Sequence, residues 1–289
     1  MTLDLSAVGF KTEPYHFKYD WKEPVLYALG IGAKRGELGY LYEGRGPKVY
    51  PTFAVVPAYA PVRALHERIG GDPATVVHTA QSVRLHRPIP PSGELVTVGQ
   101  VAGIYDMKRM AQVILETRTE AAGEPCCETR WSILYRGAGR FGGASPPKRE
   151  NPAVPDGQPP SFTQEEAIPA EQALLYRLSG DSNPLHADPD FAARAGFEGG
   201  PILHGLCTYG YLARAAIQHA CQGDGNRMIV FEGQFKRPVW PGETLITRGY
   251  DLGEGRIALR AYSTSRPETL VTSCWAELST RTRRKQAIP

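Results

Sequence analysis

The chain of 289 residues has few cysteines, no long apolar run and little net charge, and each shortage excludes a class of protein. The five cysteines form no Cys-x-x-Cys pair, which excludes a disulfide framework and predicts buried apolar thiols at Cys126, Cys127, Cys207, Cys221 and Cys274. The longest stretch without a charged residue is 15 residues (199–213) and contains His204 and four glycines. A membrane-spanning helix needs about 20 apolar residues, so we expect none and no membrane partner. The net charge of +3 gives no reason to expect nucleic acid as a partner.

Targeting patterns are missing from both ends of the sequence. The first residues, Met-Thr-Leu-Asp, are not a basic region followed by an apolar one, as a secretory signal would be. The last three, Ala-Ile-Pro, are not a peroxisomal address of the Ser-Lys-Leu type. We therefore expect a cytoplasmic location.

Two segments of the first half recur in the second half at the same spacing. Val-Leu-Tyr-Ala-Leu at 25–29 returns as Leu-Leu-Tyr-Arg-Leu at 174–178, and the Arg-Pro…Gly-Glu segment at 87–95 returns at 237–245. Tyr27 and Tyr176 are 149 residues apart, and so are Gly93 and Gly242. A period this long indicates duplication of a whole domain rather than a solenoid repeat. We expect units at 1–145 and 161–289, joined by a linker at 146–160 that is rich in proline and mixed charges.

Each half shows the same coarse order of elements. A short helical segment comes first (23–32 and 171–179), then a loop and a longer helix, which in the second half covers 203–221. Strand patterns follow, at 78–87, 95–105, 111–119 and 128–135 in the first half and at 228–237, 243–251, 256–263 and 270–279 in the second. This order predicts an α+β fold in which a long helix packs on an antiparallel sheet, twice. Two such units could join their edge strands into one sheet.

The densest group of chemically active side chains lies just after the helical segment 171–179. Gly180 is a typical residue to end that helix, and the Asn183-Pro184 pair disfavours helix at Asn183. Asp181 and His186 therefore lie on a bent loop, where a carboxylate and an imidazole can converge on one water for acid–base work. The alternative is that Asp181 or Asn183 caps the next helix and His186 packs on it. At the repeat spacing, Gly32 takes the place of Asp181 and no Asn-Pro-Leu-His follows, which favours a single function over a need of the fold.

The segment 199–208, Gly-Gly-Pro-Ile-Leu-His-Gly-Leu-Cys-Thr, opens the second long helix. Free backbone N–H groups and the positive end of the helix dipole gather at such a start and suit a developing oxyanion. Gly205 would let a ligand approach the backbone closely, or would serve only tight helix packing. His204 is either a ligand-contacting group or a structural histidine.

The run Tyr-x-x-Ser-Gly-Asp-x-Asn-Pro-Leu-His-x-Asp-Pro at 176–189, followed by Ala-Gly-Phe and Pro-Ile-Leu-His-Gly-Leu-Cys-Thr, resembles a known family. It is similar to the type-2, R-specific enoyl-CoA hydratases of the MaoC-like hot-dog superfamily, and to the hydratase portion of peroxisomal multifunctional enzyme type 2. The resemblance implies a double hot-dog fold and the reversible hydration of a trans-2-enoyl-CoA to a (3R)-3-hydroxyacyl-CoA. It also implies that the N-terminal half has lost its catalytic residues and accommodates a long acyl chain.

The resemblance further assigns roles to individual residues. Gly205 would donate its N–H to the thioester carbonyl, Asp181 and His186 would activate the water and handle the proton, and Asn183 would orient either this pair or the substrate. Substrate contacts are implied for His78, Thr79, Lys108, Ser182, Pro184, Leu185 and Phe235, with auxiliary roles for Glu43 and His204. No metal or redox cofactor is implied, because coenzyme A is part of the substrate, and a homodimer is expected.

Two other functions stay open at this point. A related dehydratase acting on an acyl carrier protein, or on a specialised CoA thioester, would use the same residues. A non-catalytic acyl-CoA-binding module would need the fold but not the complete set of Asp181, Asn183, His186 and Gly205, so the presence of that set argues against it.

Overall fold

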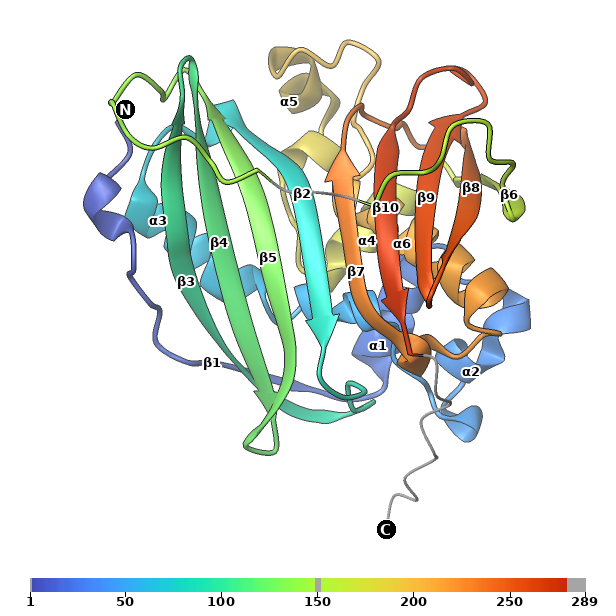
Figure 1. Ribbon diagram of the computed structural model, residues 1–289. Helices are drawn as coiled ribbons and strands as arrows, with labels where there is room; N and C mark the ends of the chain where they lie inside the picture. The colour runs from blue at the N-terminus through green and yellow to red at the C-terminus, as the bar shows by residue number, and fades with distance from the viewer. Residues whose placement is uncertain (1, 149–151, 280–289) are drawn as a thin grey trace.

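A computed structural model describes residues 2–148 and 152–279 of the chain, and its main feature is one ten-stranded antiparallel sheet (Figure 1). The strands follow the order β1-β3-β4-β5-β2-β7-β10-β9-β8-β6. Their bounds are β1 Tyr15–Tyr19, β2 Val76–Leu85, β3 Gly93–Met107, β4 Met110–Ala121, β5 Glu124–Arg136, β6 Phe162–Ala167, β7 Met228–Phe235, β8 Thr244–Gly253, β9 Arg256–Ser263 and β10 Thr272–Leu278.

The sheet consists of two equivalent halves that meet between β2 and β7. Reading outward from this seam, the strands of each half stand in the same order, so β2 matches β7, β5 matches β10 and β1 matches β6. The seam itself is antiparallel and pairs Ala80 with Gln234 and Arg84 with Val230. The joining of two duplicated units through their edge strands is therefore confirmed, whereas the proposed unit boundaries stay a prediction.

The helices cover one face of the sheet, behind the strands in Figure 1. The bounds are α1 Lys22–Gly30, α2 Leu38–Leu41, α3 Tyr59–Ile69, α4 Gln172–Tyr176, α5 Pro189–Arg194 and α6 Gly205–Ala220. Helix α3 packs on β3 and β4, and α6 packs on β7 to β10. One long helix is thus wrapped by each half of the sheet, which confirms the α+β double hot-dog fold.

Several details differ from the expected elements. The edge strands β1 and β6 were not predicted, and the helix expected at 171–179 ends early because its last turn is the 3-10 turn Arg177–Ser179. All five cysteines are buried and free, as expected. In the described parts of the chain, no helix is both long and apolar enough to cross a membrane.

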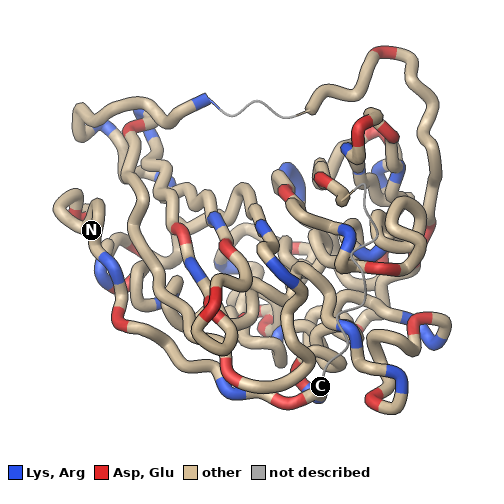
Figure 2. The backbone as a smooth tube through the Cα atoms, turned by 60° about the horizontal axis from the view of Figure 1, so that its bottom comes forward, with Lys and Arg blue, Asp and Glu red and all other residues tan. Residues whose placement is uncertain are grey.

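The segment after β5 crosses the face of the sheet that the helices leave open (Figure 1). Pro146 and Pro147 line a cavity of ≈ 350 Å³ together with Thr79, Gln112 and Lys236 from the strands below. Acidic and basic residues are scattered over the backbone and do not gather by sign in one region (Figure 2).

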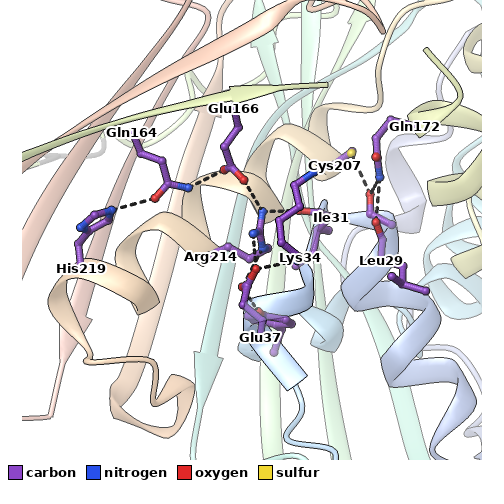
Figure 3. A network of polar contacts seen from close by, with 12 residues as sticks. Leu29, Ile31, Lys34, Glu37, Gln164, Glu166, Gln172, Cys207, Arg214 and His219 are labelled. Carbon is purple, nitrogen blue, oxygen red and sulfur yellow. Dashed lines mark hydrogen bonds and ion pairs between the residues drawn. The ribbon is translucent and has the colours of Figure 1, made fainter. Parts of the chain in front are cut away.

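A buried ion network joins the two halves on the helix side (Figure 3). Arg214 in the middle of α6 is 1% exposed, and it lies between Glu37 of the N-terminal half and Glu166 of β6. Its Nη2 is 2.5 Å from one oxygen of Glu37 and its Nη1 is 3.0 Å from Glu166, while Nη1 also donates to the carbonyl of Ile31 at 3.2 Å. A charge so deeply buried is stable only because acceptors satisfy it on several sides.

Candidate active site

The Asp-x-Asn-Pro-Leu-His segment folds as a short loop between two helical turns. The turn Arg177–Ser179 ends at Gly180, whose φ of 126° lies in the region that favours glycine. The side-chain oxygen of Asn183 accepts the N–H of Leu185 at 3.0 Å, so Asn183 caps the turn Pro184–His186. Asn183 thus fixes the turn that carries the histidine, whereas the next helix, α5, is capped by Asp188, so the expected alternative of a helix cap at Asp181 or Asn183 is wrong.

Asp181, His186 and His204 meet at one place. One ligand-type atom from each lies within 4.8 Å of those from the other two. Two groups that hydrogen-bond the same water at about 2.8 Å lie about 4.6 Å apart, so this spacing suits a water shared between them. The three are also residue types that bind divalent metals, so this is the place in the described chain where a metal could be held.

The hydrogen bonds of His186 decide which nitrogen is free. Its Nδ1 lies 2.8 Å from the carbonyl oxygen of Ile202, so Nδ1 carries a proton and donates it, and Nε2 keeps its lone pair. Burial lowers the pKa of His186, against the opposing effect of the Asp181 charge. The imidazole is therefore neutral at pH 7 and able to accept a proton.

Gly205 is the first residue of α6 and follows His204 directly. The first N–H groups of a helix have no partner within the helix and point out of its positive end. A β-carbon on Gly205 would lie 3.3 Å from the ring of Phe235, a tighter contact than side chains usually make. Glycine thus allows the Phe235 ring to pack directly against the start of α6, the packing role that the sequence left open, and its role toward a ligand stays a prediction.

Aromatic residues from the N-terminal half border the same space. The His78 ring stacks on Trp131 at 5.1 Å and meets Phe235 edge-on, also at 5.1 Å. Burial lowers the pKa of His78 to about 4, so the ring is uncharged at neutral pH. Thr79 lies where the pairing of β2 with β5 is irregular. His78 therefore stands near Gly205, with Phe235 between, whereas Thr79 lines the cavity under Pro146 and Pro147.

The other residues singled out from the sequence lie at the surface. Ser182 and Pro184 are exposed on the loop, and Leu185 is half-buried. Lys108 is exposed at the tip of the β3–β4 hairpin, and Glu43 is exposed in the 3-10 turn Glu43–Arg45. Their roles in substrate binding stay predictions.

Tyr59 is a neighbour of the site that motif reading missed. It is the first residue of α3, in the N-terminal half, and a β-carbon on Gly180 would come within 2.8 Å of its ring. Its hydroxyl lies 3.1 Å from that of Tyr176. Burial, together with the charge of Asp181, raises the pKa of Tyr59. The one signal in the sequence was Pro61, since proline is tolerated in the first turn of a helix and therefore marks its start.

The N-terminal half cannot hold the same group. Gly32, the counterpart of Asp181 at the repeat spacing, has a φ of 80°, and a β-carbon there would run into the ring of Tyr211. A side chain at this position would therefore displace a buried residue of α6. In the part of the chain that the structure describes, the N-terminal half therefore has no counterpart of Asp181 at the repeat spacing.

Comparison with known proteins identifies a family for each half of the chain. Residues 17–137 match the MFE-2 hydratase 2 N-terminal domain, and residues 152–267 match the MaoC like domain. The chain is 38% identical over 271 residues to 3-hydroxyacyl-thioester dehydratase Y of Mycobacterium tuberculosis, covering 90% of this chain and 91% of that protein. It is 38% identical over 262 residues to the peroxisomal enoyl-CoA hydratase 2 of Arabidopsis thaliana, covering 83% and 84%.

A solved structure shows the same fold over the whole length. The MaoC-like dehydratase from Phytophthora capsici superposes with a TM-score of 0.86 at 28% identity, covering 97% of this chain and 100% of that one. Both domain matches fall on the two halves of the sheet, in the expected order. The chain belongs to the MaoC-like hydratase family, in which an MFE-2 hydratase 2 N-terminal domain precedes a MaoC-like domain.

Proposed function

We propose that this chain catalyses the reversible addition of water to a trans-2-enoyl-CoA, which gives a (3R)-3-hydroxyacyl-CoA. The observation that carries the proposal is the meeting of Asp181 and His186 beside the first amide of α6. The names of the two relatives, a hydratase and a 3-hydroxyacyl-thioester dehydratase, describe the two directions of this reaction and support it.

In the proposed mechanism, the thioester carbonyl accepts the N–H of Gly205, and the positive end of α6 stabilises the enolate-like charge that develops on this oxygen. A water held between Asp181 and the free Nε2 of His186 loses a proton to this pair as its oxygen bonds to C3. The pair returns a proton to C2, which completes the addition. Asn183 contributes by capping the turn that holds His186.

Loss of the enoyl-thioester absorbance tests the proposal directly, with crotonyl-CoA and trans-2-decenoyl-CoA as substrates. We expect both to be consumed and the product to be oxidised by a (3R)-specific dehydrogenase but not by a (3S)-specific one. Turnover of crotonyl-CoA alone would count against a long acyl chain in the N-terminal half. Binding of both thioesters without turnover would replace the proposal with a binding module.

A second candidate is the same chemistry on an acyl carrier protein. The name of the mycobacterial relative, 3-hydroxyacyl-thioester dehydratase Y, does not say which carrier forms the thioester. The comparison that decides is kcat/KM for crotonyl-CoA against crotonyl-acyl carrier protein. We expect the CoA thioester to be preferred, and the reverse order would make this second candidate the function.

The amide of Gly205 can be removed without breaking the helix. Proline is tolerated at the first helical residue, and the preceding residue, His204, already has the extended backbone (φ −58°, ψ 135°) that proline requires. We expect Gly205→Pro to lower kcat by about 10²–10³ relative to Gly205→Ala, the usual effect of losing one oxyanion donor. Because Gly205→Ala adds a β-carbon but keeps the N–H, equal kcat values in the two variants would exclude a role for this amide.

We further propose that neither a metal nor a redox cofactor takes part. The addition of water needs only proton transfer and stabilisation of the developing oxyanion, which Asp181, His186 and the amide of Gly205 supply in the proposed mechanism. Dialysis against EDTA should leave kcat unchanged, and added Zn²⁺ should not raise it. Loss of activity on dialysis that Zn²⁺ restores would show that the group holds a catalytic metal.

We also propose that the protein forms a homodimer and that it is located in the cytoplasm. Light scattering should then give about twice the 31.7 kDa mass of one chain. Cell fractionation with an antibody to the chain checks the compartment, and enrichment in peroxisomes would contradict the cytoplasmic location.

A further inference from the structure

His204 connects the three parts of the site, although it takes no step in the proposed reaction. It stands between the loop that carries Ile202 and the first residue of α6, and it is 1% exposed. Its backbone carbonyl accepts the N–H groups of Cys207 and Thr208 and so starts the helix. The residue is therefore held rigidly from its own backbone.

The ring of His204 contacts both members of the acid–base pair. It stacks on the ring of His186 with centroids 3.7 Å apart and an interplanar angle of 27°. Its Nε2 lies 3.2 Å from the backbone oxygen of Asp181, so Nε2 carries the proton and donates it to this carbonyl. The His204 side chain thus fixes both the ring of His186 and the backbone of Asp181.

A structural role alone does not account for a histidine at this position. Its Nδ1 is buried and has no hydrogen-bond partner among the described residues, which is unfavourable. A phenylalanine would fill the space and keep the stacking without that unpaired acceptor. What the histidine adds is the donor to Asp181, and burial beside His186 lowers its pKa to about 2, so it adds no charge to the site.

We propose that His204 is a positioning residue for the hydration. It holds Asp181 and His186 in a fixed position relative to the amide of Gly205. This inference rests on the proposed function, because a fixed register matters only if the three groups act on one substrate. Errors of about 1 Å in such a register cost up to about 10²-fold in rate.

Two substitutions separate the two contacts. His204→Phe keeps the stacked ring but cannot donate to Asp181, whereas His204→Gln keeps a donor of similar reach but loses the ring. We expect both to fold and to lower kcat for crotonyl-CoA by about 10-fold or more, with KM changed less than about threefold, because the substrate contacts are intact. The matched control is His66→Gln, because His66 is a half-buried histidine of α3 in the N-terminal half, where its Nδ1 hydrogen-bonds with the hydroxyl of Tyr135, and its replacement should leave kcat unchanged.

A second readout does not depend on turnover. The titratable groups around His186 are Asp181 and His204 itself, with Arg177 acting on His204 from the preceding turn. Loss of the stacked ring admits water, so the pKa of His186, followed by NMR, should rise in His204→Gln and stay unchanged in His204→Phe. Unchanged kcat in both folded variants, or a His186 pKa that His204→Gln does not move, would overturn the inference. If wild-type protein turns over no thioester while the pKa of His186 still rises in His204→Gln, only the proposed function fails.

Discussion

Replacing Asp181 by asparagine, or His186 by glutamine, is expected to lower kcat for enoyl-CoA hydration by about 10²–10⁴, the usual contribution of one acid–base group. Each substitution keeps the size of the side chain and removes its ability to exchange a proton at the shared water. Because the two groups act on that one water, the double variant should lose little more than the worse single variant. Steady-state kinetics with crotonyl-CoA measures all three.

The controls for this prediction are an acid and a histidine outside the site. Asp72 is exposed and caps a 3-10 turn of the N-terminal half. Nδ1 of His66 forms a hydrogen bond with the hydroxyl of Tyr135. Asp72→Asn and His66→Gln should both retain the wild-type kcat. A loss of less than about fivefold in either site variant would exclude that residue from the chemistry, because acid–base groups contribute far more.

The pH dependence of kcat/KM provides a second test of the pairing of Asp181 with His186. Burial holds the pKa of His186 below its usual value of about 6.5, and the neighbouring carboxylate of Asp181 opposes this effect. If neutral His186 accepts the proton, kcat/KM falls as the pH drops through this pKa, below about 6.5. Asp181→Asn removes the group that raises the pKa, so its remaining activity should fall at a still lower pH. If kcat/KM of Asp181→Asn falls at the same pH as kcat/KM of the wild type, the result would contradict the pairing of Asp181 with His186.

Much of the site could be predicted from sequence because its residues are neighbours along the chain. The bend at Gly180 and Asn183 follows from local backbone preferences, which a single sequence shows directly. The start of α6 next to His204 was predicted two residues too early, since helix ends depend on hydrogen bonds that the sequence does not fix.

The contributions of the N-terminal half could not be predicted in this way. Tyr59 reaches the site through its contact with Tyr176 at the end of α4, and Trp131 through its stacking on His78, and the sequence near these residues does not predict either contact. The edge strands β1 and β6 were missed for a related reason. They are short and half exposed, so their alternating pattern is too brief to separate from a polar loop.

Arg214 is the clearest case of a residue whose role needed the structure. It stands in Leu-Ala-Arg-Ala-Ala at 212–216, inside a helix that is otherwise apolar along this stretch. A lone charge in such a run predicts either a buried ion pair or an exposed stripe. The structure shows a buried ion pair, in which Arg214 contacts Glu37 of the N-terminal half and Glu166 of the C-terminal half.

Replacing Arg214 by methionine is expected to lower the free energy of unfolding by about 3–5 kcal/mol at pH 7, the usual cost of removing one partner from a buried ion pair. Methionine fills a similar volume, so the loss comes from the carboxylates of Glu37 and Glu166, which would stay buried without their cation. Urea unfolding followed by tryptophan fluorescence measures it. Arg256→Met is the control, because Arg256 pairs with Glu254 at the exposed end of β9 and should cost less than about 1 kcal/mol.

The effect of pH separates this mechanism from a packing defect. In the wild type, burial would raise the pKa of Glu37, but hydrogen bonds and charge from Arg214 outweigh it and hold the pKa below its usual value. This contribution to stability is present above the unfolded pKa of about 4.3 and is lost as the pH falls through the folded value. Without Arg214, burial is opposed only by the hydrogen bonds from Tyr50 and from the N–H of Lys34, so the pKa of Glu37 should rise, and lowering the pH from 7 to 5 should reduce the stability that Arg214→Met loses relative to the wild type. Adding Glu37→Gln and Glu166→Gln to Arg214→Met should restore most of the lost stability at pH 7, since no buried charge then remains. A loss that is independent of pH, or that the two glutamines do not reduce, would show that Arg214 stabilises the fold through its packing.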